Sequence, residues 1–258
     1  MGQARPEVVY HLAALSSVGR SWEEPAQTLA DNVSGAINLL EAIRQRAPGT
    51  RVIWVSTCEV YGVPSALPIP ERAAMHPANP YAVSKATGEM LASVYADAHG
   101  LDLVIARPFS HAGPGQLPIF LLSSLTRQAA EGRRRGVGRL KIVTGNPDTR
   151  RDFIDVRDVV DAYRRLAGAG TGGVYNVSSG RSVSVAEQVA LLAEVIAPIE
   201  VEHIVDPARI RAHEVMDLRG DHSRLTADTG WEPVIPLRQT MADAIDWWEE
   251  SLGAEPVR

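Results

Sequence analysis

The sequence is short of cysteine, of long apolar runs and of any large excess of charge. Cys58 is the only cysteine, which excludes an intrachain disulfide and the metal sites that need two cysteines. No apolar run approaches the roughly 18 residues of a membrane-spanning helix, and the first residues contain no apolar signal core. With 26 basic and 31 acidic residues, the net charge of −5 gives no reason to expect nucleic acid or a membrane as a partner. We therefore expect a cytoplasmic protein.

The residues that are present favour a globular α/β protein. Hydrophobic residues make up 45% of the chain and charged residues 22%, which is the balance of a protein with a substantial core. Apolar strands alternate with amphipathic helices, as in a parallel sheet that is covered on both faces. We expect buried strands over 8–12, 51–56 and 101–107, and helices over 25–46, 80–99, 118–131, 155–166, 184–196 and 236–252.

A Tyr-x-x-x-Lys pair lies inside the helix expected over 80–99. Tyr81 and Lys85 are four residues apart, so their side chains share one face of that helix. A phenol normally titrates near 10, and a neighbouring ammonium group favours the phenolate. We therefore expect Lys85 to lower the pKa of Tyr81. The pair alone also fits an ordinary amphipathic helix, so it does not assign a function.

Two polar residues follow the strand expected over 51–56. Thr57 and Glu59 stand at its carboxyl end, the edge of a parallel sheet where ligands bind. Thr57 can hydrogen-bond a substrate oxygen beside the Tyr81 hydroxyl, and Glu59 can act as an acid, a base or a hydrogen-bond partner. In isolation such a stretch is typical of a turn or a helix cap. One strand before a Tyr-x-x-x-Lys helix, it indicates an active site.

Seven motifs carry a family resemblance. They are HLAA at 11–14, STCEVYG at 56–62, NPYAVSK at 79–85, RPFSHAGPGQ at 107–116, RDFIDVRDV at 151–159, YNV at 175–177 and GW at 230–231. As an ordered set that covers nearly the whole chain, they resemble the extended short-chain dehydrogenase/reductase family that acts on nucleotide-diphosphate sugars. Within it the chain is most similar to GDP-6-deoxy-4-keto-mannose reductases, then to GDP-mannose 4,6-dehydratases. Galactose 4-epimerases resemble it less, because they usually carry no carboxylate at the Glu59 position.

The resemblance implies a role for each residue of the active site. Tyr81 would exchange a proton with the C4 oxygen of the sugar while a hydride passes between C4 and the nicotinamide of NADP or NAD. Lys85 would hold the nicotinamide ribose, and Thr57 would share the hydrogen bond to the sugar oxygen. In a dehydratase, Glu59 would remove a ring proton of the sugar.

The resemblance also implies the binding residues. Those for the cofactor are Leu12, Ala13, Ala14, Tyr81, Lys85, Pro108 and His111. Those for a nucleotide-diphosphate sugar, GDP-linked in this branch, are Ser110, Arg127, Arg151, Arg211 and Glu214. Guanidinium groups suit phosphate oxygens, whereas Ser110 stands where the family usually carries Asn. No metal site is implied. Family members are commonly homodimers, formed through the helices that match 25–46 and 80–99.

The implied fold is a Rossmann-type parallel sheet with a smaller α/β substrate-binding lobe. Residues 1–109 would be a partial dinucleotide-binding domain, and 110–258 mainly a nucleotide-sugar-binding lobe with some segments returning to the sheet. No glycine-rich loop follows a first strand and opens a helix. Because the first strand resembles the family's fourth, we expect a sheet truncated at its N-terminal side by on the order of sixty residues. The strand over 8–12 would be an unpaired edge, and the chain alone would bind NADPH very weakly.

Three functions stay open. The first is NADPH-dependent reduction at C4 of a GDP-4-keto-6-deoxyhexose, with activity in doubt for a truncated chain. The second is a GDP-mannose 4,6-dehydratase or a nucleotide-sugar epimerase. The third is a non-catalytic fragment that still binds a nucleotide sugar. The base, the sugar and the choice between NAD and NADP are also open, because the residues that read the adenosine ribose would lie in the segment expected to be missing.

Overall fold

The computed structural model describes residues 6–169, 172–210 and 215–254, and it forms two compact units. The first unit is drawn from residues 1–109, 160–180 and 220–232. The second is drawn from residues 110–159, 181–219 and 233–258. The chain therefore crosses from the first unit to the second after Phe109 and returns twice.

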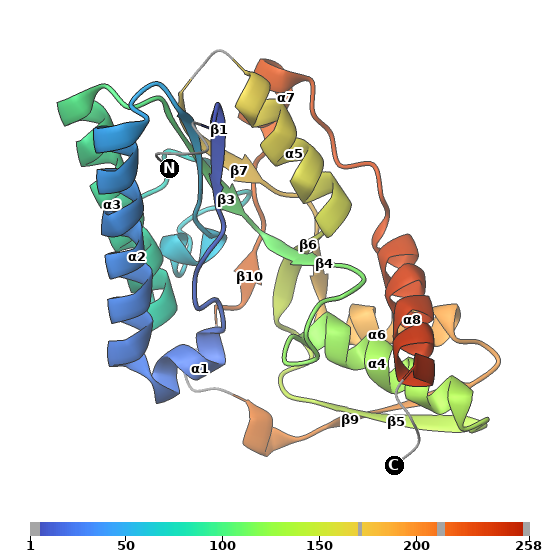
Figure 1. Ribbon diagram of the computed structural model, residues 1–258. Coiled ribbons are helices and arrows are strands. Elements are labelled where there is room, and N and C mark those ends of the chain that lie inside the picture. The colour runs from blue at the N-terminus through green and yellow to red at the C-terminus, as the bar shows by residue number, and fades with distance from the viewer. Residues whose placement is uncertain (1–5, 170–171, 211–214, 255–258) are drawn as a thin grey trace. The chain divides into compact units, whose positions relative to one another are not determined.

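A parallel sheet forms the centre of the first unit (Figure 1). Its strands, in spatial order, are β1 (Val8–His11), β2 (Arg51–Val55), β3 (Leu103–Pro108) and β7 (Gly173–Val177). All three neighbouring pairs are parallel. The carboxyl ends of the four strands consequently lie at one edge of the sheet, which is where open α/β sheets bind ligands.

Two long helices pack side by side against this sheet, and both have the predicted bounds. They are α2 (Pro25–Arg46) and α3 (Pro80–His99) (Figure 1). A proline opens each helix, and the Asn79 side chain caps α3 by accepting a hydrogen bond of 2.8 Å from the Ala82 amide. Their inner faces form one core with β2 and β3, whose buried members include Leu40, Ile43, Val52, Trp54, Ala92 and Ile105.

The first strand is less buried than predicted. Among the described strands, β1 pairs only with β2, and it stands at the end of the sheet. Tyr10 is 42% exposed, and Leu12, which follows the strand, is 60% exposed. No described strand covers the outer side of β1, as the predicted unpaired edge requires, and the expectation of a buried strand is wrong for this element.

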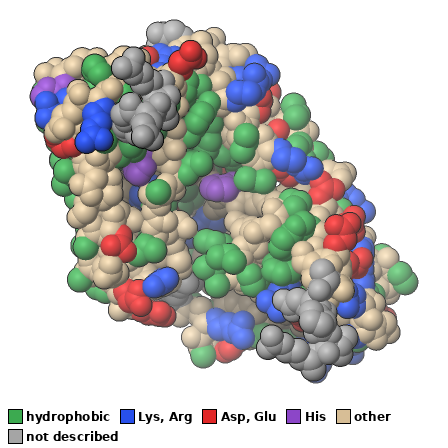
Figure 2. All heavy atoms as spheres, viewed as in Figure 1, with side chains coloured by type: hydrophobic (Ala, Val, Ile, Leu, Met, Phe, Trp, Pro, Cys, Tyr) green, Lys and Arg blue, Asp and Glu red, His purple; other side chains and the backbone are tan. Residues whose placement is uncertain are grey.

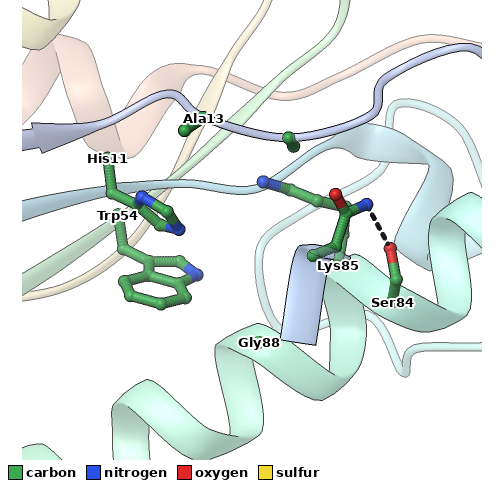
Figure 3. Close-up of a pocket in the computed structure, with 8 residues that line it drawn as sticks. His11, Ala13, Trp54, Ser84, Lys85 and Gly88 are labelled. Carbon is green, nitrogen blue, oxygen red and sulfur yellow. Dashed lines mark hydrogen bonds between the residues drawn. The ribbon is translucent and has the colours of Figure 1, made fainter. Parts of the chain in front are cut away.

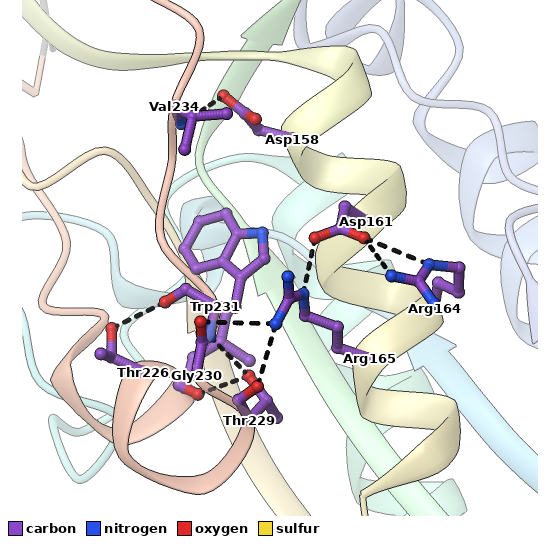
Figure 4. Close-up of polar contacts among 10 residues, drawn as sticks. Asp158, Asp161, Arg164, Arg165, Thr226, Thr229, Gly230, Trp231 and Val234 are labelled. Atoms are coloured by element: carbon purple, nitrogen blue, oxygen red, sulfur yellow. Dashed lines mark hydrogen bonds and ion pairs between the residues drawn. The ribbon is translucent and has the colours of Figure 1, made fainter.

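Short helices complete the first unit. They are α1 (Val18–Glu23), the 3-10 turn η1 (Cys58–Tyr61), the last turns of α5 (Val156–Gly168) and α7 (Ser223–Thr229). Arg165 on α5 pairs with Asp161 at 2.6 Å and donates to the Thr229 carbonyl at 3.2 Å (Figure 4). Trp231 beside it is fully buried. The Gly-Trp motif at 230–231 therefore packs the turn after α7 against α5.

In its described residues, the second unit contains two small sheets and three helices besides the first turn of α5. In one sheet β4 (Ser110–Ala112) and β10 (Asp217–Leu218) flank β6 (Arg150–Asp155) in parallel, and β8 (Ser182–Ser184) pairs with β6 antiparallel. The other pairs β5 (Arg139–Thr144) with β9 (Glu200–Val205), which precedes the turn η2 (Pro207–Arg209). The helices are α4 (Leu121–Arg134), α6 (Val185–Val195) and α8 (Leu237–Ala254). Leu125, Ile142, Leu192 and Ile245 join these helices to the β5–β9 pair in one core.

Side-chain to backbone hydrogen bonds fix two junctions of the second unit. Ser184 accepts a hydrogen bond from the Glu187 amide at 3.0 Å, and its own amide donates to Glu187 at 2.7 Å. This is the capping box that the sequence predicts at the start of α6. The Asp158 carboxylate accepts from the amides of Val234 and Ile235 at 3.1 and 2.9 Å (Figure 4), which fixes the segment before α8.

The surface carries charges of both signs. In the view of Figure 2, basic and acidic side chains are interspersed over both units rather than gathered into one basic area. No helix in the described part of the chain is both long and apolar enough to cross a membrane. The described residues also contain no cluster of three or more His, Cys, Asp or Glu side chains that could hold a metal ion.

Candidate active site

The side chains of Thr57 and Tyr81 meet at the carboxyl end of β2. Thr57 directly caps η1, where its hydroxyl accepts a hydrogen bond of 3.2 Å from the Glu59 amide. Tyr81 is the second residue of α3 and is 8% exposed. Thr57 acts on the Tyr81 phenol as a hydrogen-bonding neighbour that lowers its pKa. Two of the predicted catalytic residues are thus in contact at the ligand-facing edge of the sheet.

The pKa of Tyr81 differs from the expectation. Burial raises the pKa of the phenol well above its usual range, and the hydrogen bond with Thr57 opposes this. The charge of Glu59 raises the pKa further. The expected lowering by Lys85 is absent from this shift; the Lys85 amine donates to the backbone carbonyl of Val55. Tyr81 is therefore protonated near neutral pH, the state in which a phenol can donate a proton.

Lys85 lies one helical turn after Tyr81 and faces a pocket (Figure 3). The side chain is buried, and burial lowers its pKa to about 8 while the charge of Glu89 acts in the opposite direction. The pocket is lined by His11, Ala13, Ala14, Asn32, Trp54, Ser84, Lys85 and Gly88. Lys85, Ala13 and Ala14, which the family resemblance associates with the cofactor, thus share one pocket.

The lining of this pocket fits the nicotinamide-ribose end of a dinucleotide. Ala13 and Ala14 are small, and Lys85 supplies a cationic donor. The indole nitrogen of Trp54 is buried with no hydrogen-bond partner, so it is a donor that a bound polar group could satisfy. No glycine-rich turn that follows a strand and opens a helix, the usual pyrophosphate site, occurs among the described residues.

Asn32 on α2 joins the pocket wall to the catalytic helix. Its carboxamide oxygen accepts from the Leu15 amide at 2.8 Å, and its nitrogen donates to the Ser84 hydroxyl at 2.8 Å. Ser84 in turn donates to the Tyr81 carbonyl at 2.7 Å. Asn32 therefore fixes the segment after β1 relative to the start of α3. The sequence does not predict this role, because an asparagine inside an amphipathic helix gives no sign of a partner 52 residues away.

His11 is a buried neutral histidine. Its ring lies on Trp54 with 4.5 Å between ring centroids (Figure 3). Burial, assisted by the positive charge of Lys85, lowers the pKa of His11 to about 4. In the unfolded chain the group titrates at its ordinary value of 6.5. Between these values the unfolded chain binds the extra proton, so the folded state loses stability as the pH falls.

We expect this histidine to make the protein acid-sensitive. From pH 7.5 to pH 5, His11 should lower the free energy of unfolding by about 2 kcal/mol. His11→Phe keeps a ring on Trp54 but cannot titrate, so it should remove this part of the pH dependence. Urea unfolding of both proteins at the two pH values measures the difference. An equal loss of stability in both would contradict the assignment of the acid sensitivity to His11.

Glu59 is held at the start of α3. Its carboxylate accepts a hydrogen bond of 3.0 Å from the Asn79 side chain, the same residue that caps α3. Glu59 is half-buried and acts electrostatically on Tyr81. Asn79 thus sets the position of the carboxylate and of the catalytic helix together. The arrangement gives a carboxylate and a phenol at one edge of the sheet.

The remaining cofactor residues divide between the two units. In the first unit, Leu12 is exposed after β1 and Pro108 is buried at the end of β3. In the second unit, His111 is exposed on β4, and its carbonyl accepts a hydrogen bond of 2.9 Å from the Gln116 side chain. The cofactor roles of these residues stay predictions.

The predicted substrate residues lie in the second unit. Ser110 is half-buried on β4. Arg127 pairs with Glu131 at 3.0 Å and lies 5.4 Å from the ring of Trp248. Arg151 donates to the carbonyls of Arg150 and Val215, both at 2.8 Å. Their roles in binding phosphate are untested. The two further substrate residues, Arg211 and Glu214, lie outside the described residues.

Several known proteins are similar to this chain in sequence. The family model described as GDP-mannose 4,6 dehydratase matches residues 1–244. GDP-6-deoxy-D-mannose reductase of Pseudomonas aeruginosa is 40% identical over 253 residues, which cover 97% of this chain and 83% of the reductase. UDP-glucose 4-epimerase of Mycolicibacterium smegmatis is 33% identical over 253 residues, 96% of this chain and 78% of the epimerase.

Solved structures give the same result. The structure of RMD from Pseudomonas aeruginosa complexed with NADPH has a TM-score of 0.88 at 38% identity, and the match covers 96% of this chain and 83% of that one. UDP-glucose 4-epimerase of Thermotoga maritima with UDP-glucose has a TM-score of 0.86 at 29% identity, covering 96% and 79%. The chain belongs to the extended short-chain dehydrogenase/reductase family of nucleotide-sugar epimerases, dehydratases and reductases.

Proposed function

We propose that this protein reduces the C4 ketone of a GDP-linked 4-keto-6-deoxyhexose with NADPH. The observation that carries the proposal is the position of Thr57, Tyr81 and Lys85, which the structure brings together at the carboxyl end of β2 and the start of α3. Reduction of a ketone needs a proton donor at the carbonyl oxygen, and the Tyr81 phenol carries its proton near neutral pH. The 40% identity to GDP-6-deoxy-D-mannose reductase supports the choice of substrate.

The residues act on the ketone as follows. When bound, the nicotinamide cofactor supplies the hydride that adds to C4. Thr57 and Tyr81 hydrogen-bond the C4 oxygen, and Tyr81 transfers its proton to that oxygen as the alcohol forms. Lys85, one helical turn after Tyr81, would hold the nicotinamide ribose. Ala13 and Ala14 form the wall on the cofactor side.

A direct absorbance assay of NADPH oxidation tests the proposal. The 258-residue chain, and a form extended by any in-frame coding sequence upstream of Met1, are incubated with NADPH and GDP-4-keto-6-deoxymannose. We expect oxidation of NADPH, followed by its near-ultraviolet absorbance, only when the ketone is present, with a GDP-6-deoxyhexose as product. If both forms leave NADPH unchanged while still melting cooperatively, the reductase proposal is wrong.

A 4,6-dehydratase is the second candidate, and the position of Glu59 favours it. The carboxylate is held within the site by Asn79 at 3.0 Å, where a base for a ring proton of the sugar would stand. Incubation with GDP-mannose separates the two activities. A dehydratase forms a keto-sugar without added NADPH, because the hydride it takes from the sugar is returned to it. A reductase leaves GDP-mannose unchanged.

Two further expectations of the resemblance remain proposals. A homodimer through α2 and α3 would cover the apolar side chains that α3 exposes, among them Met90 and Val94, each 62% exposed. The third function, a non-catalytic fragment that retains nucleotide-sugar binding, predicts binding of GDP-sugar with no turnover in the assays above. Thr57, Glu59, Tyr81 and Lys85 together favour the reductase over this alternative.

A further inference from the structure

A buried ion pair joins the catalytic helix α3 to strand β3. Glu89 on α3 and Arg107 on β3 have side chains that are only 3% and 6% exposed. The Arg107 guanidinium donates to both carboxylate oxygens of Glu89, with Nη2 at 2.6 Å and Nε at 3.0 and 3.2 Å. Such a two-pronged contact fixes orientation as well as distance. The pair therefore locks α3 to the carboxyl-terminal half of β3.

Arg107 also holds the segment that follows β2. Its Nη1 donates to the Tyr61 hydroxyl at 3.0 Å and to the Glu71 carbonyl at 3.1 Å, and its guanidinium lies 4.9 Å from the centre of the Tyr61 ring. Tyr61 is the last residue of η1, the turn that begins after Thr57, and its hydroxyl donates to Asn176 on β7 at 2.7 Å. One guanidinium thus joins the elements that carry Thr57, Glu59 and Lys85.

Glu89 faces Lys85 along α3. The two residues are four apart, on the same side of the helix. Two other groups act on Lys85 or contact it: His11 on β1, which lines the same pocket, and the Val55 carbonyl on β2, which accepts a hydrogen bond from the amine. His11 and Tyr81 are neutral near pH 7. Glu89 is the carboxylate whose charge acts on Lys85, and it favours the ammonium form.

Stability alone does not explain such a pair. Removing two charges from water costs several kcal/mol per ion, and apolar residues of similar volume often replace a buried pair without loss. The pair lies between α3, η1 and β3, the elements that form the site. We propose that Glu89 and Arg107 are positioning residues: they hold α3, which carries Lys85, in register with the Thr57–Glu59 turn, and they place the Glu89 carboxylate one helical turn after Lys85.

The chain suits a direct test, because Lys85 and Lys141 are its only lysines. Lysine labelled with ¹³C at Cε gives one NMR signal for each, and Lys141→Arg identifies the signal of Lys85. Glu89→Gln keeps the shape of the side chain but removes its charge. We expect it to lower the pKa of Lys85 by about one unit, a tenfold loss of proton affinity.

The direction in which the pKa of Lys85 changes in Glu89→Gln distinguishes this role from a purely structural one. Loosened packing would admit water and move the pKa of Lys85 upward, toward its ordinary value of 10.5. Arg107→Met is the second variant: it frees Glu89 to interact with Lys85, so we expect the pKa to rise. An unchanged or raised pKa in Glu89→Gln would overturn the proposal, and so would a fall in both variants.

Glu41→Gln is the matched control. Glu41 on α2 also binds an arginine and a tyrosine, Arg44 at 2.7 Å and Tyr95 at 2.8 Å, but on the surface. Glu41→Gln should leave the NMR signal of Lys85 and its pKa unchanged.

The importance of Lys85 for turnover rests on the proposed reductase function, whereas the NMR titration does not. In an active protein, Glu89→Gln should also move the alkaline decline of kcat to a lower pH by about one unit. If the wild type is inactive, the function fails and the titration still decides the role of Glu89.

Discussion

Tyr81→Phe is expected to lower kcat for ketone reduction by about a thousandfold, while KM for the nucleotide sugar changes by less than about threefold. The variant loses one oxygen, which hydrogen-bonds Thr57 and is placed to protonate the substrate. Proton transfer by a positioned side chain contributes about 10² to 10⁴ in rate. Binding of the nucleotide depends on other parts of the chain, so the loss should fall on kcat.

Initial rates of NADPH oxidation over a range of ketone concentrations give both constants. Tyr95→Phe is the matched control, because it removes a phenol from the same helix whose partner is Glu41 on the surface. It should keep kcat within about twofold of the wild type. A Tyr81→Phe variant with more than about a tenth of the wild-type kcat would show that another group donates the proton.

Gly62→Ala is expected to lower the free energy of unfolding by about 4 kcal/mol. Gly62 ends η1 at φ +60° and ψ −132°, outside the left-handed helical region, in a conformation that costs residues with a Cβ about 1–3 kcal/mol. A Cβ built there would lie 1.9 Å from the backbone oxygen of His76, so the backbone must move. The turn that carries Thr57 and Glu59 would be displaced, and activity should fall with stability.

Gly100→Ala is the comparison variant. Gly100 also has a positive φ, +66°, but its ψ of 31° lies in the left-handed helical region, and a Cβ added to it would meet no other atom within 4 Å. It should cost only the conformational part, about 1 kcal/mol. Urea unfolding of the two variants and the wild type measures the difference. Equal losses in the two variants would contradict the clash with His76.

The elements predicted well are those with local signals at their ends. Proline opens α2 and α3, Asn79 caps α3, and Gly100 ends it at positive φ, so both helices have the predicted bounds. The helix expected from residue 118 begins at Leu121 instead, because residues 117–120 form a turn in which the Phe120 amide donates to the Leu117 carbonyl. The strands β4, β8 and β10 have two or three residues, too few to show a period in the sequence.

Some features of the site could also be predicted from the sequence, and others could not. Tyr81, Lys85 and Thr57 stand in short motifs, and the parallel sheet brings those motifs to one edge, so their proximity could be predicted. The pKa of Tyr81 could not, because it depends on burial that the sequence does not reveal. Nor could the pairing of Glu89 with Arg107, which joins residues 18 apart on a helix and a strand. Such partners are chosen by tertiary packing and leave no pattern in the sequence.

The central claim is that this site delivers hydride to C4 while Tyr81 protonates the oxygen. Transfer of deuterium from the cofactor to the sugar tests this claim most directly. NADPH carrying deuterium at the transferring position of the nicotinamide is incubated with GDP-4-keto-6-deoxymannose, and the sugar product is examined by NMR. We predict deuterium at C4 of the product from the wild-type protein and, in the same incubation time, about a thousandth as much labelled product from Tyr81→Phe. Product without deuterium at C4, or equal labelling by the variant, would contradict it.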